Sequence, residues 1–183
     1  MQGFVWIVNL KKKRKKRNRM KKINNFQYLW ISLIVIILDQ VTKILVRLKM
    51  SRQSIEVLGD FFRLTHVQNC GAAFSLSLGG PLINRIVFAA ITILFLVVIL
   101  YILHKSHSKA EHIAYPLVVG GAIGNLIDRI FIGSVTDFLD FDFPDFIMQR
   151  WPIFNVADSA IVVAITILLI YFIFFEKKAM EAK

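Results

Sequence analysis

Cysteine is almost absent from this chain of 183 residues, since Cys70 is the only one. A single thiol excludes an intramolecular disulfide, and only a partner from elsewhere in the fold could activate it as a nucleophile, because no histidine lies beside it. The four histidines also lack convincing metal-ligand spacing with cysteine or carboxylates. We therefore expect an activity that needs no disulfide, no metal and no catalytic cysteine.

Charge is sparse outside one basic segment. Ten of the 23 Lys and Arg residues lie between positions 11 and 22. The net charge of +11 therefore falls to 11 − 10 = +1 for the rest of the chain. Such a run could bind nucleic acid. Beside a first membrane span it fits better a topology signal that also contacts anionic lipid, worth about 1 kcal/mol per basic residue near the surface. We expect residues 1–25 to form a basic cytoplasmic arm, with no nucleic-acid partner.

Long apolar runs dominate the remainder. Positions 86–103 and 159–175 contain no charged residue, and each run approaches the roughly 20 residues that a spanning helix needs. Two further apolar segments, starting near positions 26 and 113, carry charges toward their far ends. With 56% hydrophobic residues, the pattern predicts an all-α membrane protein with a four-helix membrane domain over residues 26–178.

Loop charges predict the orientation of the spans. Four spans place both termini on one side, together with the basic arm, the loop near position 107 and the C-terminal tail of residues 179–183. The opposite loops, 48–80 and 131–153, hold only four basic residues. The chain is therefore expected to be N-in and C-in, with those loops facing outward. Aromatic and β-branched residues predict short strands within 51–80, and the charged, Phe-rich segment 138–151 predicts an interfacial helix or loop.

Five clusters of polar and small residues lie at or near the outward ends of the spans. They occupy positions 39–43, 69–75, 124–129, 135–141 and 154–160. Ionisable groups near a bilayer are costly and usually face a cavity or a partner. Their gathering on one side indicates a single site at the outward face.

Two of the clusters place charged residues on one helix face. Asp39 and Lys43 are four residues apart, which fits a structural ion pair or a role in supporting a site. Asn125, Asp128 and Arg129 have i, i+3 and i+4 spacing, which fits either a polar clamp between helices or a contact with substrate. The neighbouring Arg129 favours the ionised form of Asp128.

Asp137 and Asp158 differ because neither has a basic neighbour in the sequence. Asn155 precedes Asp158 by one helical turn, so both side chains could face one cavity. Each aspartate alone could be a helix cap or a solvated charge. As a converging pair they could share one proton, one acting as base on a water molecule and the other as acid. The spacing by itself does not establish convergence.

Taken together, the five clusters resemble lipoprotein signal peptidase, the type II signal peptidase of bacteria, over about residues 28–175. The resemblance implies a four-span aspartyl endopeptidase of the bacterial inner membrane, with a small extracytoplasmic β-cradle and a mobile helix. Such an enzyme removes the signal peptide from diacylglyceryl-modified prolipoproteins, just before the lipidated cysteine. It needs no metal or organic cofactor and is blocked by globomycin.

The resemblance also assigns roles to residues. Asp137 and Asp158 would form the catalytic dyad. Residues lining the site or holding substrate and inhibitor would be Asn69, Asn125, Arg129 and Asn155, and supporting residues would be Asp39, Lys43 and Asp128. The alternative is a small transporter or proton-conducting bundle. It would spread polar residues through the membrane depth, whereas here they cluster on one side.

Overall fold

The computed structural model describes residues 25–50, 54–71, 79–143 and 150–176. Its helices are α2 (Leu29–Lys49), α3 (Pro81–Lys105), α4 (Lys109–Phe131) and α5 (Val156–Tyr171), with a 3-10 turn, η1 (Asn25–Tyr28), and a π-helical turn, η3 (Phe172–Glu176). The strands are β1 (Ile55–Leu58), β2 (Phe62–Asn69) and β3 (Val135–Phe141). The predicted arm, apart from Asn25, and the predicted C-terminal tail lie outside the described residues.

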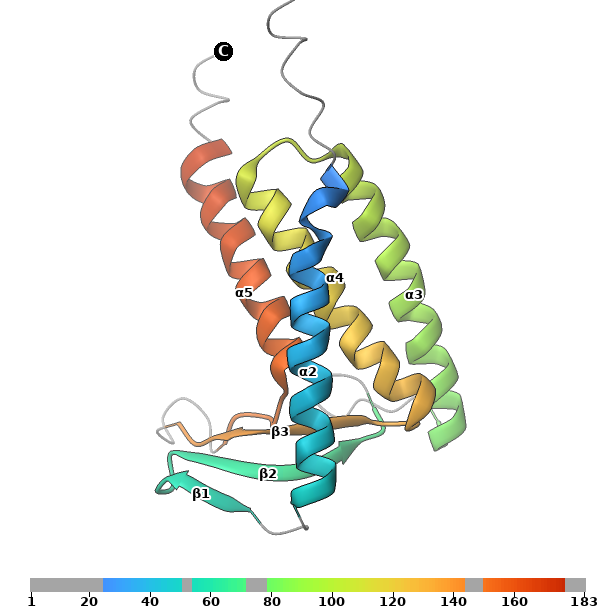
Figure 1. Cartoon of the computed structure of the whole chain (residues 1–183), viewed down its shortest axis with the longest axis vertical. Coiled ribbons are helices and arrows are strands. Elements are labelled where there is room, and N and C mark those ends of the chain that lie inside the picture. Colours follow the sequence, from blue (N-terminus) through green and yellow to red (C-terminus); the bar gives the residue numbers. More distant parts are fainter. Residues whose placement is uncertain (1–24, 51–53, 72–78, 144–149, 177–183) are drawn as a thin grey trace, which may run out of the picture.

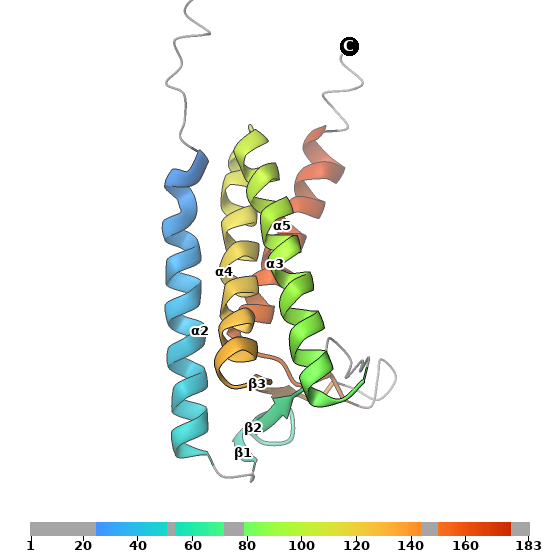
Figure 2. The ribbon, with the colours of Figure 1, turned by 90° about the vertical axis from the view of Figure 1, so that its right-hand side faces the viewer.

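Four helices of the described part are long and apolar enough to cross a membrane, which confirms the predicted spans. They form a bundle, and the three-stranded sheet lies across its lower end in Figure 1. The turns η1 and η3 lie at the opposite end with the α3–α4 turn, whereas the strands from the predicted loops 48–80 and 131–153 pair with one another at the sheet end. Figure 2 shows the same arrangement from the side, with α4 between α2 and α3.

Helix α4 is the centre of the bundle and packs against α2, α3 and α5. It begins at a capping box, in which the Ser108 hydroxyl accepts the Glu111 N–H and the Glu111 carboxylate accepts the Ser108 N–H. Most of its residues beyond the first turn are buried, whereas α3 and α5 leave many large apolar side chains exposed. That contrast fits a central helix surrounded by protein and outer helices that contact lipid.

Two glycines let α4 approach its neighbours closely. A Cβ on Gly121 would lie 2.5 Å from the carbonyl oxygen of Ala157 in α5. A Cβ on Gly124 would lie 2.6 Å from a carboxylate oxygen of Asp39 in α2. Both separations are far below van der Waals contact, so only glycine permits this packing.

The sheet has the order β1-β2-β3, and both pairs of strands are antiparallel. In the register of β2 and β3, Val67 lies opposite Asp137 and Asn69 lies opposite Val135. The start of β3 is thus held beside the end of β2, where two of the polar clusters meet.

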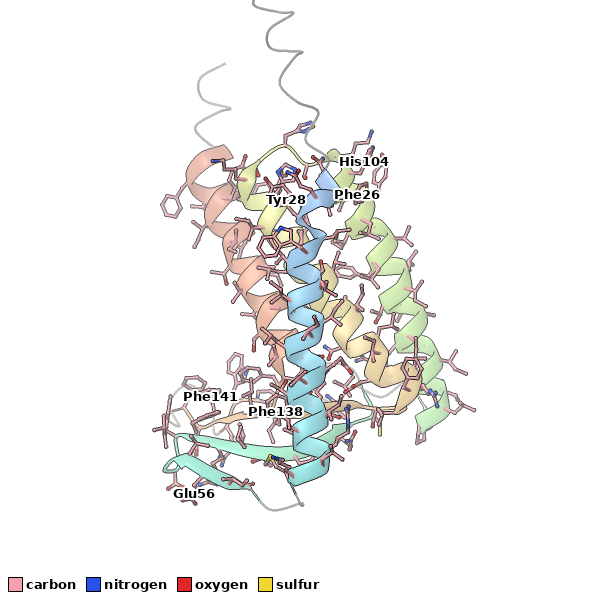
Figure 3. All side chains as sticks on the ribbon, in the orientation of Figure 1. Phe26, Tyr28, Glu56, His104, Phe138 and Phe141 are labelled. Atoms are coloured by element: carbon pink, nitrogen blue, oxygen red, sulfur yellow. The ribbon has the colours of Figure 1, made fainter. Side chains whose placement is uncertain are left out.

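The segment from Phe138 onward was predicted to be an interfacial helix or loop, and for its first four residues this is wrong. Residues 138–141 belong to β3, because the backbone pairs with β2 on one side and with Phe154 on the other. Phe138 is buried, while the ring of Phe141 stacks on those of Phe62 and Phe154 (Figure 3). Positions 144–149 of that prediction lie outside the described residues.

The end of the bundle opposite the sheet is fastened by Asn25. Its amide nitrogen donates to the carbonyl oxygens of Leu103, His104 and Ser106 at the end of α3. Its amide oxygen lies 3.0 Å from Nε2 of His112 in α4. The entry into η1 is therefore joined to the turn between α3 and α4, far from the sheet (Figure 3).

Candidate active site

Asp158 is fixed at the start of α5 by a capping box. The Asn155 side-chain oxygen accepts the Asp158 N–H at 3.0 Å, and Oδ2 of Asp158 accepts the Asn155 N–H at 3.2 Å. Asn155 therefore precedes the helix rather than lying one turn earlier within it, as the sequence spacing suggested. The exchange orients both side chains.

Asp137 lies near the start of β3 and is only 4% exposed. Asn69, near the end of β2, donates its amide to Oδ2 of Asp137 at 3.1 Å. Asn155 donates its amide to the other oxygen, Oδ1, at 2.7 Å. Both oxygens of this carboxylate are therefore oriented by neutral amide donors from different segments.

Asn125 of α4 completes the connection between the two aspartates. Its amide nitrogen donates to Oδ1 of Asp158 at 2.8 Å. Its amide oxygen accepts from Asn155 Nδ2 at 3.1 Å and from Lys43 Nζ at 2.9 Å. The structure thus brings Asp137 and Asp158 together around one asparagine, Asn155, although they lie on a strand and a helix.

The environment of Asp137 raises the pKa of its carboxyl toward neutral pH. Burial, followed by the negative charge of Asp158, raises the pKa of Asp137 to about 6. The amide donors of Asn69 and Asn155 and the charge of Lys43 oppose this increase in pKa without cancelling it. Asp137 can therefore hold a proton or release it within the range where carboxyl acid and base catalysis operates.

A buried ion network lies next to the two aspartates. Lys43 Nζ is 2.8 Å from Asp39 and 3.6 Å from Asp128, and all three side chains are at most 1% exposed. Asp39 also accepts the N–H of Ala157 at 3.0 Å, and Asp128 accepts the N–H of Thr136 at 2.9 Å. Each buried carboxylate therefore fixes the backbone of the residue immediately before one of the two site aspartates.

Comparison with known proteins identifies the family that has this arrangement. Residues 31–174 match the family model of signal peptidase (SPase) II. The chain belongs to the signal peptidase II family. The lipoprotein signal peptidase of Halothermothrix orenii is 42% identical over 143 residues, which cover 77% of this chain and 91% of that protein. That of Enterococcus faecalis is also 42% identical, over 159 residues that cover 85% and 93% of the two chains.

Solved structures of bacterial membrane enzymes share the fold of this chain. A bacterial membrane enzyme solved by the in meso method has a TM-score of 0.71 at 33% identity, covering 80% of this chain and 87% of that one. A second such structure has a TM-score of 0.70 at 32% identity, covering 81% and 94%. The predicted family and fold class are therefore confirmed, and the chain is a membrane-embedded peptidase with four spans and a small sheet.

One electrostatic prediction from the sequence was wrong. Asp128 was expected to have Arg129 as its cation, but its ion pairs are with Lys43 and, at 3.2 Å, with Arg47. Adjacent residues on a helix point about 100° apart, so Asp128 and Arg129 face different neighbours. Arg47 was missed, although it follows Lys43 by four residues and so shares the face of Asp39 and Lys43.

Arg129 lies at the edge of the site. Its guanidinium is 6.0 Å from the ring centroid of Phe88 and donates to the Asn125 carbonyl at 3.4 Å. The negative charges of Asp158 and Asp137 act on it. Among the described residues no ion pair of Arg129 is found, so this cation faces the site without being neutralised in a close pair.

Two further observations bear on the predicted site. Gln40, which the sequence analysis left without a role, donates its amide to the Gly124 carbonyl at 3.0 Å and to Asp39 at 3.1 Å. Within the described part of the chain, no group of three or more His, Cys, Asp or Glu residues could hold a metal ion. Positions 72–75 of the second polar cluster lie outside that part.

Proposed function

We propose that this member of the signal peptidase II family is an aspartic endopeptidase with Asp137 and Asp158 as its catalytic dyad. It cuts prolipoproteins that carry a diacylglyceryl cysteine, just before that cysteine. Family membership supports the substrate class. The observation that carries the catalytic assignment is Asn155, which contacts Oδ1 of Asp137 through its amide and both the N–H and the carboxylate of Asp158.

The pair divides the chemistry between one acid and one base. Asp158 accepts a proton from water, whose oxygen attacks the carbonyl carbon of the scissile peptide. Asp137, whose pKa of about 6 lets it hold a proton, donates that proton to the carbonyl oxygen. The tetrahedral intermediate then collapses: Asp137 takes a proton back from a hydroxyl of the intermediate, Asp158 gives its proton to the leaving nitrogen, and the C–N bond breaks. The products are a new carboxylate and an α-amino group on the lipidated cysteine.

The surrounding residues keep this geometry. Asn69, Asn125 and Asn155 orient the carboxylates with amides, which fix direction without adding a charge. Arg129 is placed to contact substrate, or an inhibitor of the globomycin type, next to the dyad. Asp39, Lys43 and Asp128 support the site, because the two carboxylates accept the N–H groups of the residues just before Asp158 and Asp137.

The orientation follows from the loop charges. With the arm and tail in the cytoplasm of a bacterial cell, the sheet and the dyad lie at the outward face of the inner membrane. A substrate anchored in lipid then reaches the site laterally. The exposed Cys70 near the end of β2 offers a test. A membrane-impermeant maleimide should label it in spheroplasts, whereas labelling only after lysis would contradict the orientation.

The distribution of buried charge argues against a transporter or proton-conducting bundle. Three fully buried ionisable side chains, those of Asp39, Lys43 and Asp128, form one compact network beside the dyad. The buried residues of α5 are all alanines, and those of α3 include no ionisable group. A relay across the membrane would need such groups along its length.

The deciding experiment is cleavage of a purified, diacylglyceryl-modified precursor in detergent. Asp137→Asn and Asp158→Asn should each lower kcat by about a thousandfold or more. Asp60→Asn is the matched control, because the Asp60 side chain is 81% exposed on the outer loop. Turnover near that of the unaltered protein in either dyad variant, with the fold intact, would sink the dyad assignment.

A further inference from the structure

Arg47 lies near the outer end of α2, where it joins two parts of the site. Its Nη1 is 3.2 Å from Oδ1 of Asp128 and 2.9 Å from the hydroxyl oxygen of Thr136. Thr136 is completely buried and directly precedes Asp137 in β3. A single nitrogen on α2 therefore contacts both the ion network and the strand that carries one catalytic aspartate.

We propose that Arg47 is a positioning residue for peptide-bond cleavage, holding β3 against α2 so that Asp137 stays aligned with Asp158. This inference rests on the proposed dyad. Arg47 itself does not contact the reacting atoms and acts through Thr136 and Asp128.

The charge balance of the network supports this role. Two carboxylates, Asp39 and Asp128, face two cations, Lys43 and Arg47. Lys43 lies closer to Asp39, at 2.8 Å, than to Asp128, at 3.6 Å, so Arg47 at 3.2 Å is the nearer cation to Asp128. Without Arg47, both buried carboxylates would share one ammonium group, and the hydrogen bond from the Thr136 N–H to Asp128 would weaken.

The hydroxyl of Thr136 is also held from the other side. Gln68 of β2, which lies opposite Thr136 in the sheet, donates its amide to this hydroxyl at 3.3 Å. The Gln68 amide oxygen accepts from the Ser134 hydroxyl at 2.7 Å. Thr136 is thus connected to α2 through Arg47 and to β2 through Gln68, which restricts the position of the neighbouring Asp137.

Kinetics on the lipidated precursor test the proposal. Arg47→Met should lower kcat about tenfold with KM changed less than about twofold, because the hydrogen bonds of Nη1 to Asp128 and Thr136 are lost away from the substrate. Arg47→Lys should recover part of kcat, since an ammonium group can pair with Asp128 but lacks the planar fork of arginine. Lys49→Gln removes the same charge from an exposed position two residues later on α2 and should match the unaltered protein.

A double-mutant cycle with Thr136→Val shows whether Arg47 acts through Thr136. If it does, adding Thr136→Val to Arg47→Met should reduce kcat by less than about twofold further. Effects that multiply would overturn the proposal, as would an unchanged kcat in folded Arg47→Met. A lower melting temperature of Arg47→Met without a lower kcat would also overturn the proposal. If Arg47→Met fails to fold, Arg47→Lys decides: a kcat equal to that of the unaltered protein refutes the role.

Failure of this inference is distinguishable from failure of the proposed function. If the unaltered protein and Lys49→Gln both cleave the precursor while Arg47→Met cleaves it equally well, only the role of Arg47 is refuted. If the unaltered protein does not cleave it, the proposed function itself is refuted.

Discussion

Replacing Asp137 with asparagine should stabilise the protein at alkaline pH while abolishing its activity. The pKa of Asp137 is raised from an ordinary 3.8 to about 6, chiefly by burial. A raised pKa in the folded state means that folding favours the protonated form. The contribution of Asp137 to stability is therefore fully present below pH 3.8 and is lost as the pH rises through 6. Ionisation of Asp137 therefore lowers the free energy of unfolding by about 3 kcal/mol at pH 8 but by only about 0.6 kcal/mol at pH 4.

Lost hydrogen bonding offsets part of the stability that Asp137→Asn gains at pH 8. The carboxylate of Asp137 accepts one amide donor on each oxygen, from Asn69 and from Asn155. An asparagine at position 137 has only one oxygen, so one donor would face an NH₂ group, at a cost of about 1 kcal/mol. The net stabilisation at pH 8 is then about 2 kcal/mol, or a rise of about 5 °C in melting temperature for a chain of this size.

Thermal unfolding in detergent, followed by tryptophan fluorescence, measures this difference directly. The unaltered protein and Asp137→Asn should be compared at pH 8 and at pH 4, where the gain should disappear or reverse slightly. Asp60→Asn serves as control, because its exposed carboxylate should give little change at either pH. A melting temperature of Asp137→Asn at or below that of the unaltered protein at pH 8 would refute the reasoning, as would a difference independent of pH.

Three other expectations follow from the geometry. Gly124→Ala, whose methyl group would lie 2.6 Å from Asp39, should lower activity at least about tenfold and reduce the yield of folded protein, whereas Gly80→Ala, with nothing within 4 Å, should do neither. Asn155→Ser should keep the helix cap and lose kcat, while Asn155→Ala should also lose about 1 kcal/mol of stability. Equal melting temperatures for the two would contradict this. Cys70→Ala should keep turnover within about twofold, and a loss comparable to that of the dyad variants would show that the thiol takes part.

The spans and the fold class could be predicted because they depend on local composition. A run such as 86–103 without charge can satisfy its backbone only as a helix when it lies in lipid. The pairing of Asp39 with Lys43 could likewise be predicted, since i,i+4 residues meet on any helix. The separation of 2.8 Å between Lys43 Nζ and Asp39 Oδ2 agrees with that expectation.

The remaining features depend on contacts between distant segments. Asp128 pairs with Arg47 rather than with its neighbour Arg129, because α2 and α4 lie side by side. The strand at 135–141 is defined by its pairing with β2, which no local pattern in that charged segment shows. Asn155 reads as an early helical residue, yet the capping box places it just outside α5. In each case the partner is more than 60 residues away or the boundary is set by a side chain.

The acidic residues Asp39, Asp128 and Asp137 have two kinds of partner, and the difference explains the chemistry of the site. Asp39 and Asp128 are paired with cations and have structural roles, since each also holds a backbone N–H next to a site aspartate. Asp137 is held by amides, which fix its direction while the more distant charge of Lys43 only moderates its pKa. A cation in direct contact would lower that pKa and remove the proton that the carbonyl oxygen must receive. The raised pKa of Asp137 therefore has two consequences: ionised Asp137 destabilises the fold, and a protonated carboxyl is available near neutral pH. A variant such as Asp137→Asn, which removes the destabilisation, should also lose the acid.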